Sequence, residues 1–219
     1  MEEMGFLRIA LENDLVNFSA LARFIKPAVE EKLGGRKASM DSLIMAVRRY
    51  AKASGGRDEN TRTLHVLAGA RIILRTGMVL LHLRRTSELY GKIIELERKY
   101  VNWHQGDKMY VLQRSEEIMV ATGRKFLPLL NGQIDRDDIL LEYHDLALLT
   151  IEYDSDANMT PGVLAFIANQ LNALDTNVYA IFNSVTKLSL IVSEAQAARL
   201  YDRLNRMLEQ SRAAVERRK

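Results

Sequence analysis

Segment 154–162 contains residue types that can form a binding site for a small anion. It reads DSDANM and ends in Thr160, Pro161 and Gly162. Thr favours a helix N-cap and Pro the first helical position, so a helix is predicted to begin at Pro161. The amides of a first helical turn and the helix dipole attract a carboxylate, and glycine lets a ligand approach the backbone. The predicted ligand-binding residues are Asp154, Asn158, Thr160, Pro161 and Gly162.

Two other interpretations of this segment were weighed. One is a helix-capping turn that binds nothing. The other is a calcium loop, because the segment opens as Asp-x-Asp-x-Asn. Calcium is not expected, since Met159 stands where such a loop needs glycine and Ala165 where it needs a bidentate glutamate.

No other pattern in the chain predicts catalysis. The four histidines have no metal-ligand spacing, and the acidic cluster at 135–142 is typical of a solvated turn. Phosphate loops, nucleophile elbows and dinucleotide fingerprints are absent from the sequence. There is no cysteine, which excludes disulfides, thiolate metal sites and a cysteine nucleophile. We therefore expect no catalytic residue, no metal site and no cofactor.

The elements around the segment follow from hydrophobic spacing. A strand is predicted at 146–153, and a helix at 161–174 carries Leu164, Ile167 and Leu171 at helical spacing. Two strands and a closing helix that includes Leu200 and Leu204 follow. Both faces of the strands are apolar, which predicts that another domain or subunit packs on the face away from the helices. A homo-oligomer through sheet or helix faces is accordingly expected.

This order of elements over 146–208, with Thr160-Pro161-Gly162 after the first strand and Asn177 before the second, resembles the ACT domain. ACT domains are the small-molecule sensing modules of aspartate kinases and related regulators. The resemblance implies an amino acid as ligand, bound at a domain interface, and it adds Asn177 to the predicted binding residues.

An earlier part of the chain repeats the pattern more loosely. Residues 70–85 align with 137–153, and a helix carrying Leu89, Ile93 and Leu96 follows. A hairpin is predicted at Gly106-Asp107 and a closing helix over 115–130. This copy has Arg85-Thr86-Ser87-Glu88 in place of the Thr-Pro-Gly turn. We predict an internal duplication, with a first module at 63–132 and a second at 137–212.

The N-terminal part, residues 1–56, is predicted to be a small helical domain that ends in a polar linker near 54–62. Its second helix, around 40–53, carries Arg48, Arg49 and Lys52 on one face. Such a basic helix resembles the recognition helix of helix-turn-helix proteins that bind DNA, although a solvated helix face is the commoner meaning of such charges.

Composition limits the remaining choices. The chain has 219 residues, 47% of them hydrophobic, and a net charge of +3, which is too small to argue for nucleic acid on charge alone. It has no long apolar run and begins Met1-Glu2-Glu3, so we expect a cytoplasmic protein without a membrane partner.

The predicted fold class is α+β: a helical, helix-turn-helix-like N-terminal domain followed by tandem ferredoxin-like modules of the ACT type, each βαββα. The whole layout looks like ACT-containing predicted regulators of amino-acid metabolism. The expected function is non-enzymatic sensing of an amino acid. Two alternatives are a DNA-binding transcriptional regulator with an ACT-type effector domain, and a regulatory subunit that binds a partner enzyme without a ligand.

Overall fold

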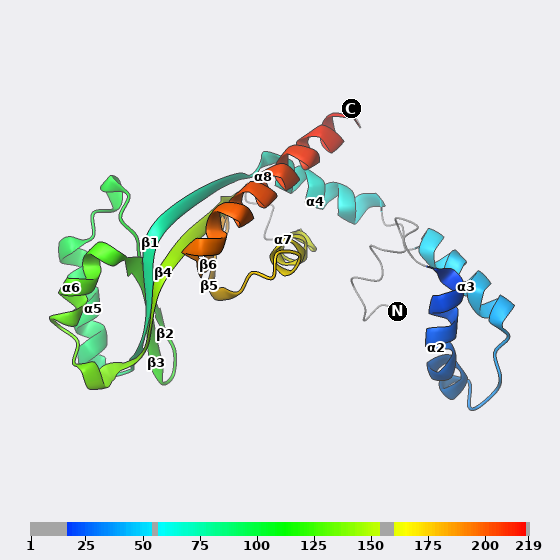
Figure 1. Ribbon diagram of the computed structural model, residues 1–219, viewed down its shortest axis with the longest axis horizontal. Coiled ribbons are helices and arrows are strands. Elements are labelled where there is room, and N and C mark those ends of the chain that lie inside the picture. The colour runs from blue at the N-terminus through cyan, green and yellow to red at the C-terminus, as the bar shows by residue number, and fades with distance from the viewer. Residues whose placement is uncertain (1–16, 54–56, 154–159, 218–219) are drawn as a thin grey trace. The chain divides into compact units, whose positions relative to one another are not determined.

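The structure is a computed structural model that describes residues 17–53, 57–153 and 160–217, with only the backbone described within 52–61 (Figure 1). The chain divides into two compact units, residues 1–60 and 61–219. Each unit is described by itself below.

The first unit contains the helices α2 (Phe18–Lys32) and α3 (Met40–Ala53), as the apolar spacing predicted. The Asn17 side chain caps α2 by accepting hydrogen bonds from two backbone amides, each at 3.0 Å. Ser39 Oγ accepts from the Ser42 amide at 3.2 Å at the start of α3. Leu21 and Val47 form the buried contact between the helices. Pro27 lies inside α2, which continues through it as one helix.

The polar linker predicted near 54–62 is wrong beyond Gly56, because the helix α4 runs from Arg57 to Gly69. Its first residues are polar, which hid the helix in the sequence. Leu67 lies in its last turn, and Ala70 follows directly after the helix. Both are buried in the core of the second unit, with 0% and 1% exposure. Residues 63–69 therefore pack with the second half of that unit, although they precede the first.

A six-stranded antiparallel sheet organises the second unit, in the order β2-β3-β1-β4-β6-β5. In chain order the elements are β1 (Arg71–Arg84), α5 (Ser87–Tyr100), η1 (Trp103–Gln105), β2 (Met109–Gln113), β3 (Glu117–Gly123), η2 (Arg124–Phe126), α6 (Leu127–Asn131), η3 (Arg136–Asp138), β4 (Ile139–Glu152), α7 (Val163–Asn172), β5 (Val178–Asn183), β6 (Lys187–Ser193) and α8 (Glu194–Glu216). Both halves therefore have the order strand, helix, two strands, helix.

The two halves share their longest strands. β1 and β4 each have 14 residues and pair antiparallel in the middle of the sheet. Residues 71–75 of β1 pair with 148–152 of β4, and residues 80–83 pair with 139–143. The first part of β1 thus extends the sheet of the second half, and the first part of β4 extends that of the first half. Figure 1 shows these two strands running together between the halves.

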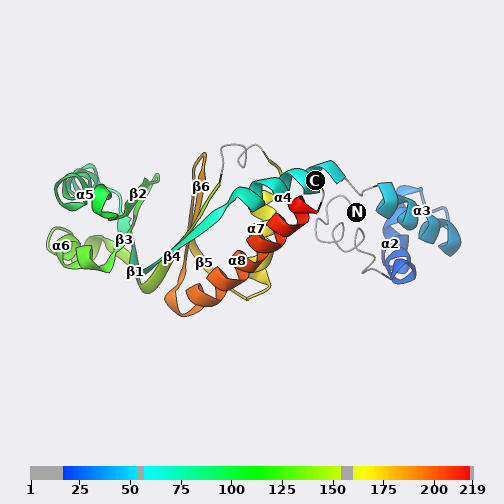
Figure 2. The ribbon, with the colours of Figure 1, turned by 90° about the horizontal axis from the view of Figure 1, so that it is seen from above.

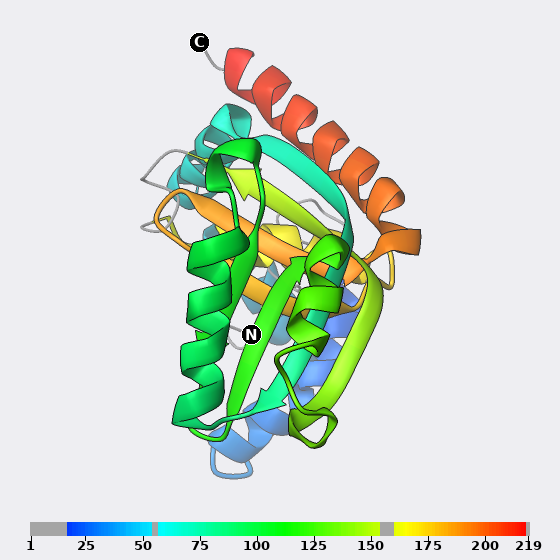
Figure 3. The ribbon, with the colours of Figure 1, turned by 90° about the vertical axis from the view of Figure 1, so that its left-hand side faces the viewer.

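The helices cover one face of the sheet and make two cores. One core, under α4, α7 and α8, includes Leu149, Ile151 and Leu190, and part of β1 through Ile72 and Leu74. The other, under α5 and α6, includes Leu81, Ile93 and Val120. Figure 3 shows α5 and α6 in front of the strands of the first half. The stripe predicted at Leu89, Ile93 and Leu96 is confirmed as buried, and so are Ile167 and Leu171 of the other stripe. Leu164, predicted in the same stripe, is 54% exposed, and Val163 is buried instead.

The opposite face of the sheet is also apolar, and the sheet curls over it. Met78, Leu80, Leu146 and Leu148 lie on this face with at most 3% exposure. Tyr110 of β2 and Phe182 of β5 stack, with ring centroids 4.7 Å apart and planes 14° apart. β2 and β5 are the two end strands of the sheet, so this contact brings its ends together. The sequence predicted that another domain or subunit covers this apolar face. In the structure, the curl of the sheet buries it.

Two details of the first half were predicted incorrectly. Gly106 does not form the hairpin; it has φ 84° and ends the short helix η1, while the hairpin between β2 and β3 turns at 114–116. The first half of the helix predicted over 115–130 is the strand β3, and helical structure begins only at Arg124, with the 3-10 turn η2 and then α6. Ile118 and Val120 face one core and Met119 and Ala121 the other, and a strand buried on both faces loses the alternation that identifies strands.

Candidate ligand-binding turn

The turn between β4 and α7 is where the predicted ligand residues fall. The helix α7 begins at Val163, and Gly162 occupies its N-cap with φ 91° and no side-chain capping bond. The prediction that Thr160 caps the helix and Pro161 is its first residue is therefore wrong by two positions. A left-handed Gly162 is not helical, so the helix can begin only after it. The amides of the first turn of α7 still point toward this turn.

The turn rests on α4, a support that the sequence did not indicate. Thr63 is 6% exposed, and its hydroxyl donates to the Pro161 carbonyl at 3.1 Å. A Cβ added at Gly162 would lie 3.3 Å from that hydroxyl oxygen. Thr63, which stands 98 positions before Pro161 in the chain, thus fixes the backbone of the turn through this hydrogen bond. Figure 2 shows α4 and α7 in the same part of the molecule.

Of the remaining predicted residues, only Asn177 can be placed. Asp154 and Asn158 lie outside the described residues. Asn177 is exposed and directly precedes β5. The first residue of β5, Val178, pairs with Val192 of β6. Val192 in turn pairs with Ala147 of β4. Ala147 is six residues before Tyr153, or about 20 Å along a strand. Asn177 therefore lies at the end of the sheet away from the turn.

Charged side chains surround the point where β4 leaves the sheet. Glu152 contacts Arg71 of β1 at 2.5 Å and Lys187 of β6 at 2.6 Å. Together with Gly69, Tyr153 and Thr186, these residues line a cavity of about 420 Å³. Lys187, and after it Arg71, holds the pKa of Glu152 below its ordinary value, while burial raises the pKa of Tyr153, whose hydroxyl donates to Asn183 Oδ1 at 3.1 Å. The cavity lies beside the turn and carries an excess cation.

This carboxylate gives a pH prediction. Because the pKa of Glu152 is lowered below 4.5 in the folded chain, its ion pairs stabilise the fold above about pH 4.5 and lose that contribution as pH falls through the folded value. We expect Glu152→Gln to destabilise the protein at pH 7 and to have progressively less effect below pH 4.5. Urea unfolding of both proteins between pH 3 and 7 measures this difference. An equal difference at every pH would contradict it.

The basic residues predicted to contact DNA belong to the first unit. Arg48 and Arg49 are exposed on α3, and the side chain of Lys52 lies outside the described atoms. The Arg48 guanidinium lies 5.8 Å from the Phe18 ring centroid. Among the described residues neither arginine forms an ion pair, so both are available to an anionic partner.

The described residues contain no group of three or more acidic or histidine side chains that could hold a metal ion. None of the helices in that part of the chain is long and apolar enough to cross a bilayer.

Comparison with known proteins identifies the fold. No family model matches the chain, and neither does any curated protein sequence. Among solved structures, the aspartate kinase from Synechocystis matches with a TM-score of 0.52 and 15% identity, over 65% of this chain and 27% of that one. The fold is ACT-like. The ligand-free regulatory subunit of aspartate kinase from Thermus thermophilus also matches, with a TM-score of 0.49 and 14% identity, over 62% of this chain and 94% of that one.

Proposed function

We propose that this chain is a non-enzymatic regulatory protein that senses an amino acid at the turn between β4 and α7. The observation that carries the proposal is the left-handed Gly162 at the start of α7, held by Thr63 beneath it. This arrangement leaves the first-turn amides without a side-chain cap at Gly162, in an ACT-like fold. A ligand carboxylate would accept hydrogen bonds from these amides.

The proposal includes two tandem ACT-type modules, in the halves predicted at 63–132 and 137–212. Their shared order of elements supports this. The ligand turn belongs to the second half, and the strands β1 and β4 connect it to the first. Sensing requires that the ligand bind one arrangement of modules or subunits better than another, and a coupling of about 1–3 kcal/mol would suffice. Light scattering with and without ligand tests the proposed homo-oligomer.

Thermal unfolding in the presence of each amino acid tests the binding site. A ligand at about 100 times its dissociation constant is expected to stabilise the chain by about 2.7 kcal/mol. Gly162→Ala should abolish most of that increment, because alanine is strained at this backbone conformation and its Cβ approaches Thr63. Gly35→Ala is the matched control, since Gly35 also has a positive φ, 83°, but open space around it.

Three outcomes are decisive for this site. Stabilisation of wild type and Gly35→Ala, but not of Gly162→Ala, supports it. Equal stabilisation of all three proteins would show that the ligand binds at a site other than the Gly162 turn. A screen in which no amino acid raises the unfolding temperature would contradict amino-acid sensing and favour a regulatory subunit that binds a partner enzyme.

DNA binding by the first unit is the second candidate, favoured by the exposed Arg48 and Arg49 on α3. It predicts binding to duplex DNA that weakens steeply with salt and is lost in the double variant Arg48→Glu, Arg49→Glu. Fluorescence anisotropy at several salt concentrations measures this. The variant Arg98→Glu, Arg114→Glu, in the second unit, removes the same charge as a control. No salt-dependent binding by the wild type would exclude this candidate.

A further inference from the structure

A cavity of about 320 Å³ in the first half has four basic residues in its lining. Its lining comes from three separate stretches: the middle of β1, the turn before β2, and the connection from β3 to α6. The four cationic side chains in this lining, which we call the basic pocket, are Arg75, Lys108, Arg124 and Lys125. Asp107 is the one carboxylate among the lining residues.

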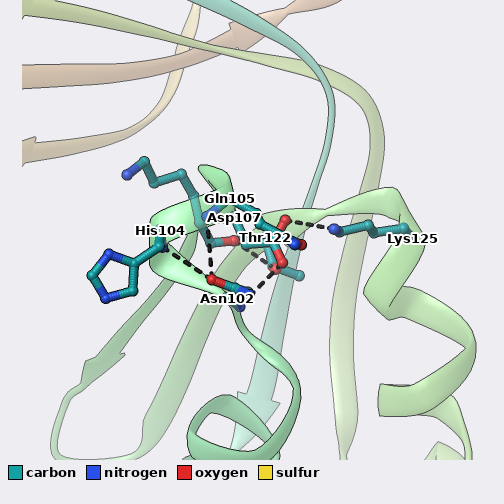
Figure 4. A network of polar contacts seen from close by, with 7 residues as sticks. Asn102, His104, Gln105, Asp107, Thr122 and Lys125 are labelled. Atoms are coloured by element: carbon teal, nitrogen blue, oxygen red, sulfur yellow. Dashed lines mark hydrogen bonds and ion pairs between the residues drawn. The ribbon is translucent and has the colours of Figure 1, made fainter.

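The turn that carries Asp107 and Lys108 is tied down by several hydrogen bonds (Figure 4). Asn102 Oδ1 accepts from the amides of His104 and Gln105, at 3.1 and 3.2 Å. The fully buried Thr122 donates from its hydroxyl to the Lys108 carbonyl at 2.8 Å. These bonds fix the backbone under the pocket before any ligand arrives, which lowers the entropy cost of binding.

Asp107 anchors one of the four cations. Its carboxylate accepts from the Asn102 amide at 3.1 Å and pairs with Lys125 Nζ at 2.5 Å. Lys125 is the main cause that holds the pKa of Asp107 below its ordinary value. Figure 4 shows Lys125 reaching from the β3–α6 connection toward this turn. The ion pair therefore holds the ammonium group at the pocket, although the Lys125 side chain remains exposed.

The other cations exceed the acidic groups that face them. Arg124 pairs with Asp145 at 2.6 Å. Glu194 is also close to the pocket, where it accepts from the Gly77 amide at 3.1 Å. Among the described residues, neither Arg75 nor Lys108 forms an ion pair with a carboxylate. Lys108 Nζ instead lies 5.3 Å from the Trp103 ring centroid. Counted with Asp107, Asp145 and Glu194, the four lining cations leave the pocket with a net positive charge, which resides on Arg75 and Lys108.

We propose that the basic pocket is a second effector site, which binds a small molecule through its phosphate group. Guanidinium groups match phosphate oxygens in a bidentate fashion. Arg75 and Lys108, which form no ion pair among the described residues, carry the charge that a phosphate would neutralise, and Arg124 and Lys125 can donate further hydrogen bonds to it. The volume lies at the lower end of the range for small-molecule sites. The pocket shares no lining residue with the turn at Gly162. On β1 it begins at Arg75, four residues from Arg71, and it spans the irregularity in β1–β4 pairing between Arg75 and Met78.

Calorimetric titration of the full chain with inorganic phosphate and with methyl phosphate tests the site. We expect saturable binding that weakens as ionic strength rises. Arg75→Gln and Arg124→Gln should each weaken it about tenfold, as for loss of one charge-assisted contact. Arg114→Gln is the matched control, because Arg114 is an exposed arginine at the β2–β3 turn, at the other end of β3. It should change binding less than about twofold.

The control separates this site from general attraction to a basic surface. Equal weakening by Arg114→Gln and Arg75→Gln would overturn the proposal, and so would the absence of saturable phosphate binding. Tighter binding of succinate than of methyl phosphate would overturn the assignment to phosphate. All three substitutions are at exposed side chains, and unchanged unfolding temperatures would show that each variant is folded. Amino-acid binding to Gly162→Ala is measured separately, so either site can fail alone.

Discussion

A fragment spanning residues 137–219 is expected to be unfolded in water, although it contains every strand and helix of the second half. It lacks residues 71–75, the part of β1 that pairs with 148–152 of β4. It also lacks Ile72 and Leu74, which pack on the core around Leu149 and Ile151, and Leu67 from α4. The fragment would therefore expose the unpaired amides of β4 and part of its apolar core to water. A unit of this size buries too little other apolar surface to stay folded without them.

Circular dichroism and amide NMR spectra of the fragment measure this, with the fragment 61–219 as the control. The longer fragment should unfold in one cooperative transition, because it is one compact unit and keeps both shared strands. A dispersed amide spectrum and a cooperative transition from 137–219 alone would show that the halves are independent, contrary to the pairing of β1 with β4.

Leu67→Ala is expected to lower the free energy of unfolding by about 2–5 kcal/mol, the usual range for a fully buried leucine. Leu67 has 0% exposure and lies in the same core as Leu149, Val163 and Leu204. The loss should also loosen the Gly162 turn, because Thr63 on the same helix supports it. Urea unfolding of the full chain, followed in the second unit, measures the change.

Leu140→Ala is the matched control for Leu67→Ala, since Leu140 is 52% exposed on β4 and its truncation should change stability by no more than about 0.5 kcal/mol. A small effect of Leu67→Ala, similar to that of Leu140→Ala, would mean that α4 does not belong to this core. A large effect would place the start of the second structural unit before the first strand.

Local spacing was enough to predict the helices that bury one stripe. Leu89, Ile93 and Leu96 on α5 recur at helical intervals and face the sheet, as do Ile167 and Leu171 on α7. The alignment of 70–85 with 137–153 predicted two matching segments, and the structure shows that each is one long strand. These features depend on residues near one another in sequence, so they can be predicted without knowing the tertiary contacts.

The features that were missed depend on distant residues. α4 begins with a polar run, and its burial comes from a core formed mostly by residues beyond 146. Ile118, Thr122 and Phe126 recur every four residues, which predicts a helix in place of β3, whereas the burial of β3 on both faces depends on the curl of the sheet. The spacing of apolar residues along one segment shows neither the distant core that buries α4 nor the curl that buries both faces of β3.

The candidate sites show the same limit. The Gly162 turn was found because its residues are consecutive, but its support by Thr63 was not, and Asn177 proved to lie at the other end of the sheet. The basic pocket joins Arg75, Lys108 and Arg124, which stand in three segments with no common motif. Only the pairing of β1 with β3 and the turn before β2 bring them together.

The shared strands also constrain how the protein is made. Arg71 and Glu152 are partners across 81 residues, so the sheet cannot be completed until β4 has left the ribosome. Until then the first half exposes one edge of β1 together with Leu80 and its apolar neighbours. A slow stretch of translation between α6 and β4 would prolong that state. The nascent chain should then depend on a chaperone that covers strand edges, more than a protein of two independent modules would.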